Sequence, residues 1–327
     1  MRICLAGHFG SELDEGVRSV GTQIGRELIK RTSNDILMIN INKMIGWKKV
    51  IAFNPDVIHF ILSPTVGGLW AAKLLSLLNP GAKTIVSAIH PSIPCKSLLR
   101  ILRPDLVLVQ TNLSMRVFQR LGYKTEFLPN GVDVERFKPI DSERRKELRN
   151  EYGLPEDKKI IVHLASFTEK RNLLILSELQ DKGTQVVIVG REKEKIDMNV
   201  VSSLQSAGCK IWIRHFSKIE EILGIADCYV FPTVDPSACI ETPLSILEAM
   251  SCNLPIITTR FGSIPELFEE GEGLRFFNDR NGLKEAFASV DEVRTRQKVS
   301  KLSWENIIRK LNGIYENQVG VSESRIT

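Results

Sequence analysis

Short apolar stretches alternate with helical patterns in two successive series, and this alternation constrains the fold of the 327-residue chain most strongly. Strands that alternate with helices favour a parallel sheet covered on both faces, and such strands are apolar throughout. The sequence therefore predicts an α/β protein with two doubly wound halves. The predicted strands of the first series are residues 2–7, 35–41, 57–62, 83–88, 105–110 and 125–128, and those of the second are 159–164, 185–190, 210–214 and 228–232.

The predicted boundary between the halves lies near Pro139. A chain of this length is comfortable for two domains. Residues 128–133 (Leu-Pro-Asn-Gly-Val-Asp) form a strong turn signal, and we expect Asn130 and Gly131 to supply a turn that tolerates positive φ. A charged helix predicted at 142–152 then opens the second series. We therefore assign residues 1–138 to the first domain and 139–300 to the second.

Charge is distributed unevenly between these halves. Residues 1–138 hold 18 Lys and Arg against 10 Asp and Glu (+8), and the remainder holds 26 against 29 (−3), which together make the net +5. A basic first half suits anionic lipid head groups, an anionic acceptor or nucleic acid, and a solvated basic surface without a partner fits equally well. Basic and aromatic residues do not interleave, so nucleic acid is not favoured as a partner.

The apolar runs and the cysteines of the sequence indicate the cellular compartment of the protein. No apolar run reaches the roughly 18 residues that a membrane span needs, and the start MRICLAGHFG is typical of a first strand rather than of a secretory signal. The six cysteines lie far apart without metal-ligand spacing, which favours buried free thiols in a reducing cytoplasm. We therefore expect a cytoplasmic protein.

Residues 235–268 carry the clearest chemical signal. A helix is predicted at 243–251, with Pro243 in its first turn, where a missing N–H has no partner to lose. The free amides of Leu244 and Ser245 would form an anion site at this helix start. Glu248, one turn further in, would accept hydrogen bonds from sugar hydroxyls, so a diphosphate with its ribose is a plausible joint ligand. The alternative is that Glu248 is a solvated helix residue.

These residues also resemble a known family. Glu248-Ala249-Met250, residues 253–256 (Asn-Leu-Pro-Ile) and residues 262–266 (Gly-Ser-Ile-Pro-Glu) resemble the donor-binding signature of glycosyltransferase family 4, the retaining enzymes with the GT-B fold. Residues 128–133, with Phe137 and Pro139 downstream, are similar to the interdomain junction of that family. The chain departs from the signature at Glu241, which is separated from Glu248 by six residues where the family has seven.

The resemblance implies a fold and a reaction. The fold would be GT-B, with two Rossmann-like domains facing each other across a cleft, and residues 301–327 would form a final helix that packs back on the first domain. The reaction would be retaining, metal-independent transfer of a sugar from a UDP- or GDP-linked donor. The acceptor would be a glycan, a lipid-linked molecule or a small molecule. No cofactor and no metal are implied, and peripheral contact with an anionic membrane at its inner face is a further expectation.

The resemblance also implies roles for individual residues. Gly16 would let the backbone approach the donor phosphate, and His90, just beyond the strand at 83–88, would orient the sugar and the acceptor. Lys170 and, second, Arg171 would bind the donor phosphates, and Glu241 would contact the sugar hydroxyls. The alternatives are a plain loop glycine, a histidine satisfied at a strand end and a solvated pair of charges.

Two other classes of function remain open. The first is a non-catalytic GT-B relative that binds a nucleotide or an assembly partner, because the chain lacks a family glycine beside Gly16 and a family arginine before Lys170. The second is another GT-B enzyme, such as a sugar-nucleotide epimerase or a phosphorylase. Titration with nucleotides and assay with UDP- and GDP-sugars separate these classes.

Overall fold

The computed structural model describes residues 1–9, 16–41, 44–62, 65–90, 102–192, 196–290 and 292–320. Contacts divide the chain into two units. Unit 1 comprises residues 1–131, 239–242 and 304–327, and unit 2 comprises 132–238 and 243–303. The final helix and the short segment Cys239–Thr242 thus belong to unit 1, although the chain around each runs through unit 2.

Unit 1 is built on a parallel sheet of six strands in the order β2-β1-β3-β4-β5-β6. The order reverses between β1 and β3, which is the switch point of a doubly wound sheet. The strands are β1 (Arg2–Gly7), β2 (Asp35–Asn40), β3 (Val57–Leu62), β4 (Lys83–Ala88), β5 (Leu106–Val109) and β6 (Thr125–Phe127). The helices are α1 (Gly16–Arg31), α2 (Met44–Phe53), α3 (Val66–Leu78), α5 (Asn112–Arg120) and α13 (Trp304–Val319).

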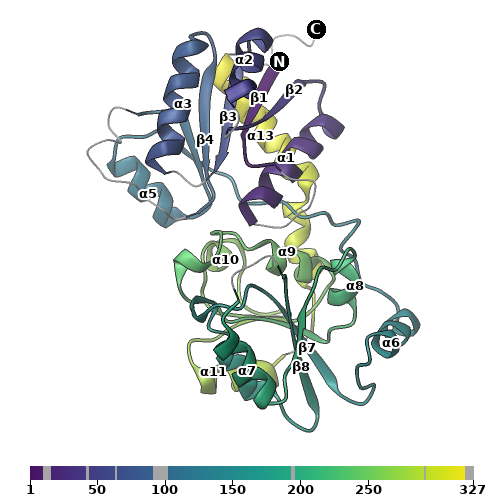
Figure 1. The fold of residues 1–327 in the computed structure, drawn as a ribbon. Helices are drawn as coiled ribbons and strands as arrows, with labels where there is room; N and C mark the ends of the chain where they lie inside the picture. The colour runs from purple at the N-terminus through teal and green to yellow at the C-terminus, as the bar shows by residue number, and fades with distance from the viewer. Residues whose placement is uncertain are drawn as a thin grey trace. The chain divides into compact units, whose positions relative to one another are not determined.

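Helices cover both faces of this sheet (Figure 1). Val50 of α2, Leu69 of α3 and Phe118 of α5 pack into one core cluster with side chains of the strands. On the other face α13 lies against α1. There the fully buried His59 of β3 contacts Tyr315 Oη through Nδ1 at 2.6 Å. Burial lowers the pKa of His59 to about 3, so the ring stays neutral and this polar contact secures the final helix.

Unit 2 repeats the architecture with the strand order β12-β11-β10-β7-β8-β9. All neighbours are parallel, and the switch point lies between β7 and β10. The strands are β7 (Lys159–Leu164), β8 (Thr184–Gly190), β9 (Lys210–Ile213), β10 (Cys228–Phe231), β11 (Ile256–Thr258) and β12 (Leu274–Phe276). The helices are α6 (Ser142–Glu151), α7 (Met198–Ser206), α8 (Ile219–Gly224), α9 (Leu244–Ser251), α10 (Ile264–Leu267), α11 (Arg280–Ala288) and α12 (Thr295–Val299). The 3-10 helices in the described part of unit 2 are η1 (Glu169–Arg171), η2 (Leu173–Leu179), η3 (Pro236–Ala238) and η4 (Ser300–Leu302).

The predicted α/β class is confirmed, and three local predictions are wrong. The sequence also predicts a helix from Asn172, but the structure has the 3-10 helix η2 there, preceded by Asn172 in the left-handed conformation (φ 54°). Pro243 caps α9 in extended conformation (φ −63°, ψ 119°) instead of forming its first turn. Neither Asn130 nor Gly131 has positive φ. No helix in the described part of the chain has the length and apolarity needed to cross a bilayer.

Gly131 is required for a different reason. A Cβ built on it would lie 2.5 Å from the indole ring of Trp304 and 3.1 Å from Trp304 Cα, so the turn must approach the start of α13 closely. We expect Gly131→Ala to lower the free energy of unfolding by about 1–3 kcal/mol through overpacking. Chemical denaturation measures this. Gly313→Ala is the control, because Gly313 lies inside the same helix with nothing within 4 Å of its Cβ position. An equal effect of both substitutions would contradict the packing explanation.

Candidate functional site

The carboxyl ends of β7 and β10 flank the switch point of unit 2, where ligands of open parallel sheets bind. The segment after β7 contains Lys170 and Arg171, both in η1. Lys170 Nζ donates to Ser237 Oγ at 2.9 Å and lies 3.9 Å from Asp235 Oδ2. Asp235 and Ser237 follow β10, so these contacts join the segments beyond the two central strands. The Lys170 side chain remains 62% exposed and accessible to a ligand.

Arg171 differs from Lys170 in having no polar partner among the described residues. Its Nε atom is buried without a hydrogen bond. A buried donor that loses water without gaining an acceptor costs about 1–3 kcal/mol. Such a guanidinium at the carboxyl end of a sheet is suited to an anion, because its planar fork of donors matches phosphate oxygens.

His163 of β7 lies in the interior beneath this segment and was not selected from the sequence. Its Nδ1 contacts Val230 O at 2.7 Å, and it is fully buried. Burial and the positive charge of Arg171 lower the pKa of His163 to about 3. The ring therefore stays neutral and adds no second positive charge beside Arg171. The only signal in the sequence is one polar residue within an apolar strand.

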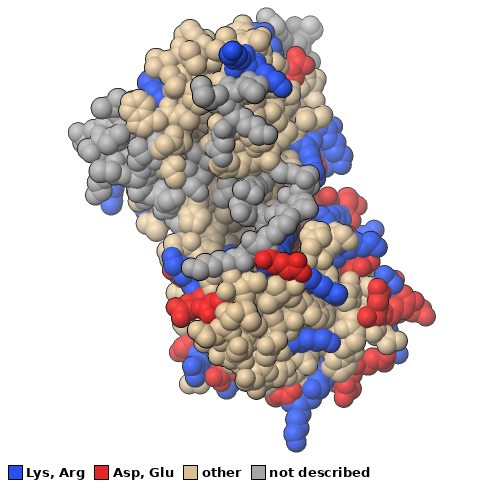
Figure 2. Space-filling view, viewed as in Figure 1, with Lys and Arg blue, Asp and Glu red and all other residues tan. Residues whose placement is uncertain are grey.

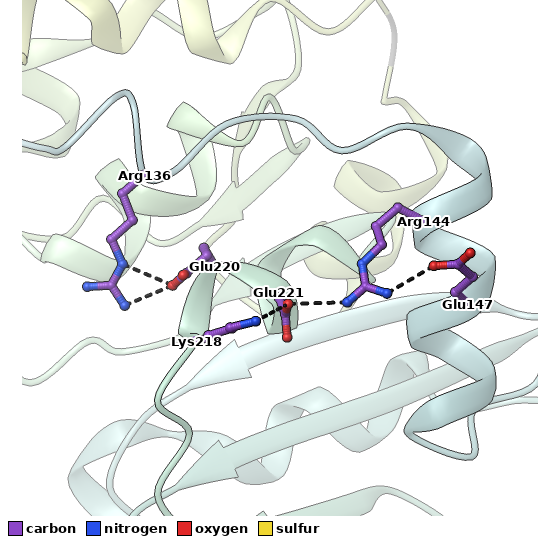
Figure 3. A network of polar contacts seen from close by, with 6 residues as sticks. All are labelled: Arg136, Arg144, Glu147, Lys218, Glu220 and Glu221. Carbon is purple, nitrogen blue, oxygen red and sulfur yellow. Dashed lines mark hydrogen bonds and ion pairs between the residues drawn. The ribbon is translucent and has the colours of Figure 1, made fainter.

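The other cations around α8 are already neutralised (Figure 3). Arg136 donates through Nε and Nη2 to Glu220 Oε2 at 2.9 and 2.8 Å. Glu221 Oε1 accepts from Lys218 at 3.2 Å and from Arg144 at 3.3 Å. These internal ion pairs leave less charge for a ligand, which distinguishes the network from Arg171.

Helix α9 begins without a side-chain cap. The amides of Leu244 and Ser245 lie in its first turn, where N–H groups have no partner within the helix. On the interior side Ile246, Leu247 and Met250 are buried, which anchors the helix in unit 2. The open end therefore retains the donors and the positive end of the helix dipole that favour an anion.

Glu248 lies one turn into α9, and its carboxyl has an unusual titration. Burial raises its pKa to about 7, partly opposed by the positive charges of Arg136 and Arg191. No side chain of the described residues donates a hydrogen bond to it. The carboxyl thus retains its full capacity to accept hydrogen bonds, and it is ionised only above about pH 7.

Glu241 belongs to unit 1, where its residue is only 6% exposed. Its Oε1 accepts hydrogen bonds from Thr111 Oγ1, at 3.1 Å, and from Ser114 Oγ, both at the start of α5. Its backbone N–H donates to Ile89 O at 3.1 Å, so the structure brings Glu241 beside His90, two residues past the end of β4. A sugar hydroxyl would have to compete with Thr111 and Ser114 for this carboxylate.

The neighbours of Glu241 are fixed by Asn130 and Gln110. Asn130 Nδ2 donates to Thr242 O at 2.7 Å, and Gln110 Nε2 donates to Asn130 Oδ1 at 2.6 Å. Thr242 N–H donates to Gln110 Oε1 at 3.1 Å. The turn at residues 128–133 therefore supplies a side chain that holds the segment Cys239–Thr242. Sequence reasoning treated Asn130 as a turn former and missed this contact.

Gly16 is the first residue of α1. Residues 10–15, which contain the acidic loop before it, lie outside the described residues, as does Pro91 after His90. In unit 1 the structure therefore brings His90 and Glu241 together. In unit 2 it places Lys170, Arg171 and α9 after the neighbouring strands β7 and β10.

The fold and these positions define a class of protein: two parallel Rossmann-like sheets, the second with unpaired or exposed cations and an uncapped helix beyond its central strands. Solved structures with a similar fold include a glycosyltransferase from Rickettsia africae (TM-score 0.77, 16% identity, 98% of this chain and 99% of that one). Anabaena HepE in complex with UDP is similar (TM-score 0.76, 13% identity, 97% and 100%). The fold is GT-B.

Sequence comparison shows which family the second half of the chain resembles. Residues 158–291 match the family described as glycosyl transferases group 1. The sulfoquinovosyl transferase SQD2 of Arabidopsis thaliana is 25% identical over 68% of this chain and 46% of its own length. A GDP-mannose-dependent phosphatidylinositol monomannoside mannosyltransferase of Mycolicibacterium smegmatis is 26% identical over 62% and 60%. Residues 158–291 are thus similar to the group 1 glycosyltransferases, and the chain spans about half the length of these two relatives.

Proposed function

We propose that the chain transfers a sugar from a UDP- or GDP-linked donor to a glycan, a lipid-linked molecule or a small molecule, with retention at the anomeric carbon and without a metal. The observation that carries the proposal is the guanidinium of Arg171 beyond β7, whose buried Nε has no hydrogen-bond partner among the described residues, beside a strand that leads to the uncapped start of α9. Cations and free amides at a switch point are what a diphosphate requires.

Lys170 and Arg171 would stabilise the diphosphate as it leaves. Negative charge grows on this group while the sugar becomes oxocarbenium-like, so fixed donors that meet the charge lower the barrier. The amides of Leu244 and Ser245 would share this role. Glu248 would accept hydrogen bonds from the ribose. This division of roles requires no metal at the leaving group, because Lys170 and Arg171 bring positive charge.

Three roles in unit 1 belong to the same proposal. Gly16, without a side chain, would admit a phosphate close to the start of α1. His90 would orient the sugar and the acceptor. For Glu241 we propose a positioning role, since Thr111 and Ser114 already occupy one of its carboxylate oxygens. It would hold the segment that precedes α9 in place.

Relatives support the donor class. One of the similar structures contains UDP, and another relative is named as GDP-mannose-dependent. Both nucleotides therefore need to be tested. Calorimetric titration of the protein with UDP, GDP and ADP is expected to give binding for one of the first two. Loss of binding by Arg171→Ala would connect that binding to the proposed site.

Catalysis is tested by nucleotide release from UDP- and GDP-sugars with and without EDTA. We expect release, by transfer or slow hydrolysis, to be unaffected by EDTA, because charge neutralisation comes from Lys170 and Arg171. An EDTA-sensitive reaction would contradict metal independence. Binding without release would favour the non-catalytic relative, and absence of nucleotide binding would contradict the whole proposal. Retention is tested by NMR of the anomeric configuration of the product.

A further inference from the structure

Helix α3 carries large apolar side chains on its solvent-facing side. Trp70, Leu74, Leu77 and Leu78 are 53%, 45%, 65% and 44% exposed. They stand at positions i, i+4, i+7 and i+8, which places them on one face of the helix. Four large apolar residues side by side form a contiguous patch, unlike the isolated apolar residues that are normal on protein surfaces.

The opposite face of the same helix is buried. Leu69, Ala72 and Leu75 are at most 3% exposed and pack in the core cluster over the sheet of unit 1. Helix α3 is therefore apolar on both faces, and only one is covered. A helix that is apolar all round normally has partners on all sides, so the outer face indicates a second apolar environment.

Charge indicates what that environment is. Helices α2 and α3 contain no Asp or Glu and three lysines: Lys48, Lys49 and Lys73. Both helices pack on the same core cluster, through Val50 in α2, so they cover the same face of the sheet. In Figure 2 the surface over α3 is mainly tan, with both blue and red groups near the top of the same body. All charged side chains of these two helices are thus positive, which complements an anionic, apolar medium.

We propose that the outer face of α3, together with the lysines of α2 and α3, docks on an anionic lipid surface. Leucines would enter the acyl boundary, Trp70 would lie at the head-group level, and the lysine ammonium groups would reach lipid phosphates. Lysine is depleted at protein–protein interfaces, which argues against a protein partner. The inference concerns a surface apart from the nucleotide-binding residues and does not depend on the proposed reaction.

The experiment is co-sedimentation with vesicles of phosphatidylcholine alone or mixed with phosphatidylglycerol. We expect binding to the mixed vesicles and at least ten-fold weaker binding by the double variant Leu74→Gln, Leu77→Gln. The control Leu113→Gln, Leu174→Gln removes two leucines that are also exposed, at 64% and 49%, and is expected to bind like the parent. The variant Lys48→Gln, Lys49→Gln should bind about five-fold more weakly for each lysine removed.

Three results would overturn the inference. The first is that the protein binds neither kind of vesicle. The second is that the two pairs of leucine substitutions weaken vesicle binding equally. The third is that light scattering shows a dimer, which only the variant Leu74→Gln, Leu77→Gln dissociates. The last result would assign the face to a second copy of the chain. Circular dichroism confirms that each variant is folded, and the solvent-facing position of the substituted leucines makes this the expected outcome.

Discussion

Replacing Arg171 with alanine is expected to lower turnover of the nucleotide sugar by about 10²-fold or more, the usual effect of losing a donor that stabilises charge in the transition state. The same substitution should not lower the free energy of unfolding, because the buried Nε has no hydrogen bond to lose. This combination separates a ligand-binding arginine from a structural one. Steady-state kinetics and chemical denaturation of the same samples measure both quantities.

Lys170→Ala is the companion variant, expected to lower turnover by about 10²-fold or more by the same reasoning. Arg280→Ala is the matched control in unit 2. Arg280 is 75% exposed and pairs with Glu178, which also pairs with Lys284. Unchanged turnover in folded Arg171→Ala would remove Arg171 from the site. Loss in Arg171→Ala alone would assign the phosphate to Arg171 and leave Lys170 as a surface contact of Ser237 and Asp235.

Glu248→Gln is expected to stabilise the protein at pH 8 and weaken nucleotide binding. Burial raises the pKa of Glu248 to about 7 in the folded protein, whereas an unfolded glutamate titrates near 4.3. The stability associated with its protonated form is therefore present below about pH 4 and is lost as pH rises to about 7. Glutamine stays neutral, so the variant avoids the cost of ionising a buried carboxyl. We therefore expect its free energy of unfolding at pH 8 to be about 1–3 kcal/mol higher, a range that allows for partial exposure of the residue.

The measurement is urea denaturation of both proteins at pH 5 and pH 8, with nucleotide titration at pH 8. The stability gain should be clearly larger at pH 8, and affinity should fall about ten-fold or more, because a hydrogen bond to a charged acceptor is lost. The control Glu285→Gln lies at an exposed position of α11. It should change neither the free energy of unfolding nor the affinity for the nucleotide. A gain of equal size at both pH values would show that ionisation of Glu248 is not its cause.

Local sequence patterns were sufficient for several of the strands and helices. The predicted strand 83–88 coincides with β4, and the predicted strand 159–164 coincides with β7. Val20, Ile24 and Leu28 are buried at the spacing expected for α1. Buried parallel strands need continuous apolar runs, and helices need apolar residues three or four apart. Both requirements are local and can be read along the chain.

Predictions that depended on distant partners were less successful. Gly131 was expected to supply positive φ, yet its role comes from Trp304, far along the chain. Asn172, where a helix was expected to begin, instead adopts the left-handed conformation between η1 and η2, and its side chain donates to Pro232 O at 3.1 Å. A turn signal indicates where the backbone changes direction, but only the packed structure shows which neighbour requires it.

The sequence by itself determined the α/β class, the doubly wound halves and the helix after residue 243, because spacing and chain punctuation encode them. Only the tertiary structure decided that Glu241 meets Ser114, 127 residues earlier in the chain, that the buried Nε of Arg171 has no hydrogen-bond partner among the described residues, and that Trp70, Leu74, Leu77 and Leu78 of α3 face solvent. Hydrogen bonding and burial depend on side chains that folding brings together from distant positions. No local pattern specifies those neighbours, so the chemistry of the site emerges only when the sheets are assembled.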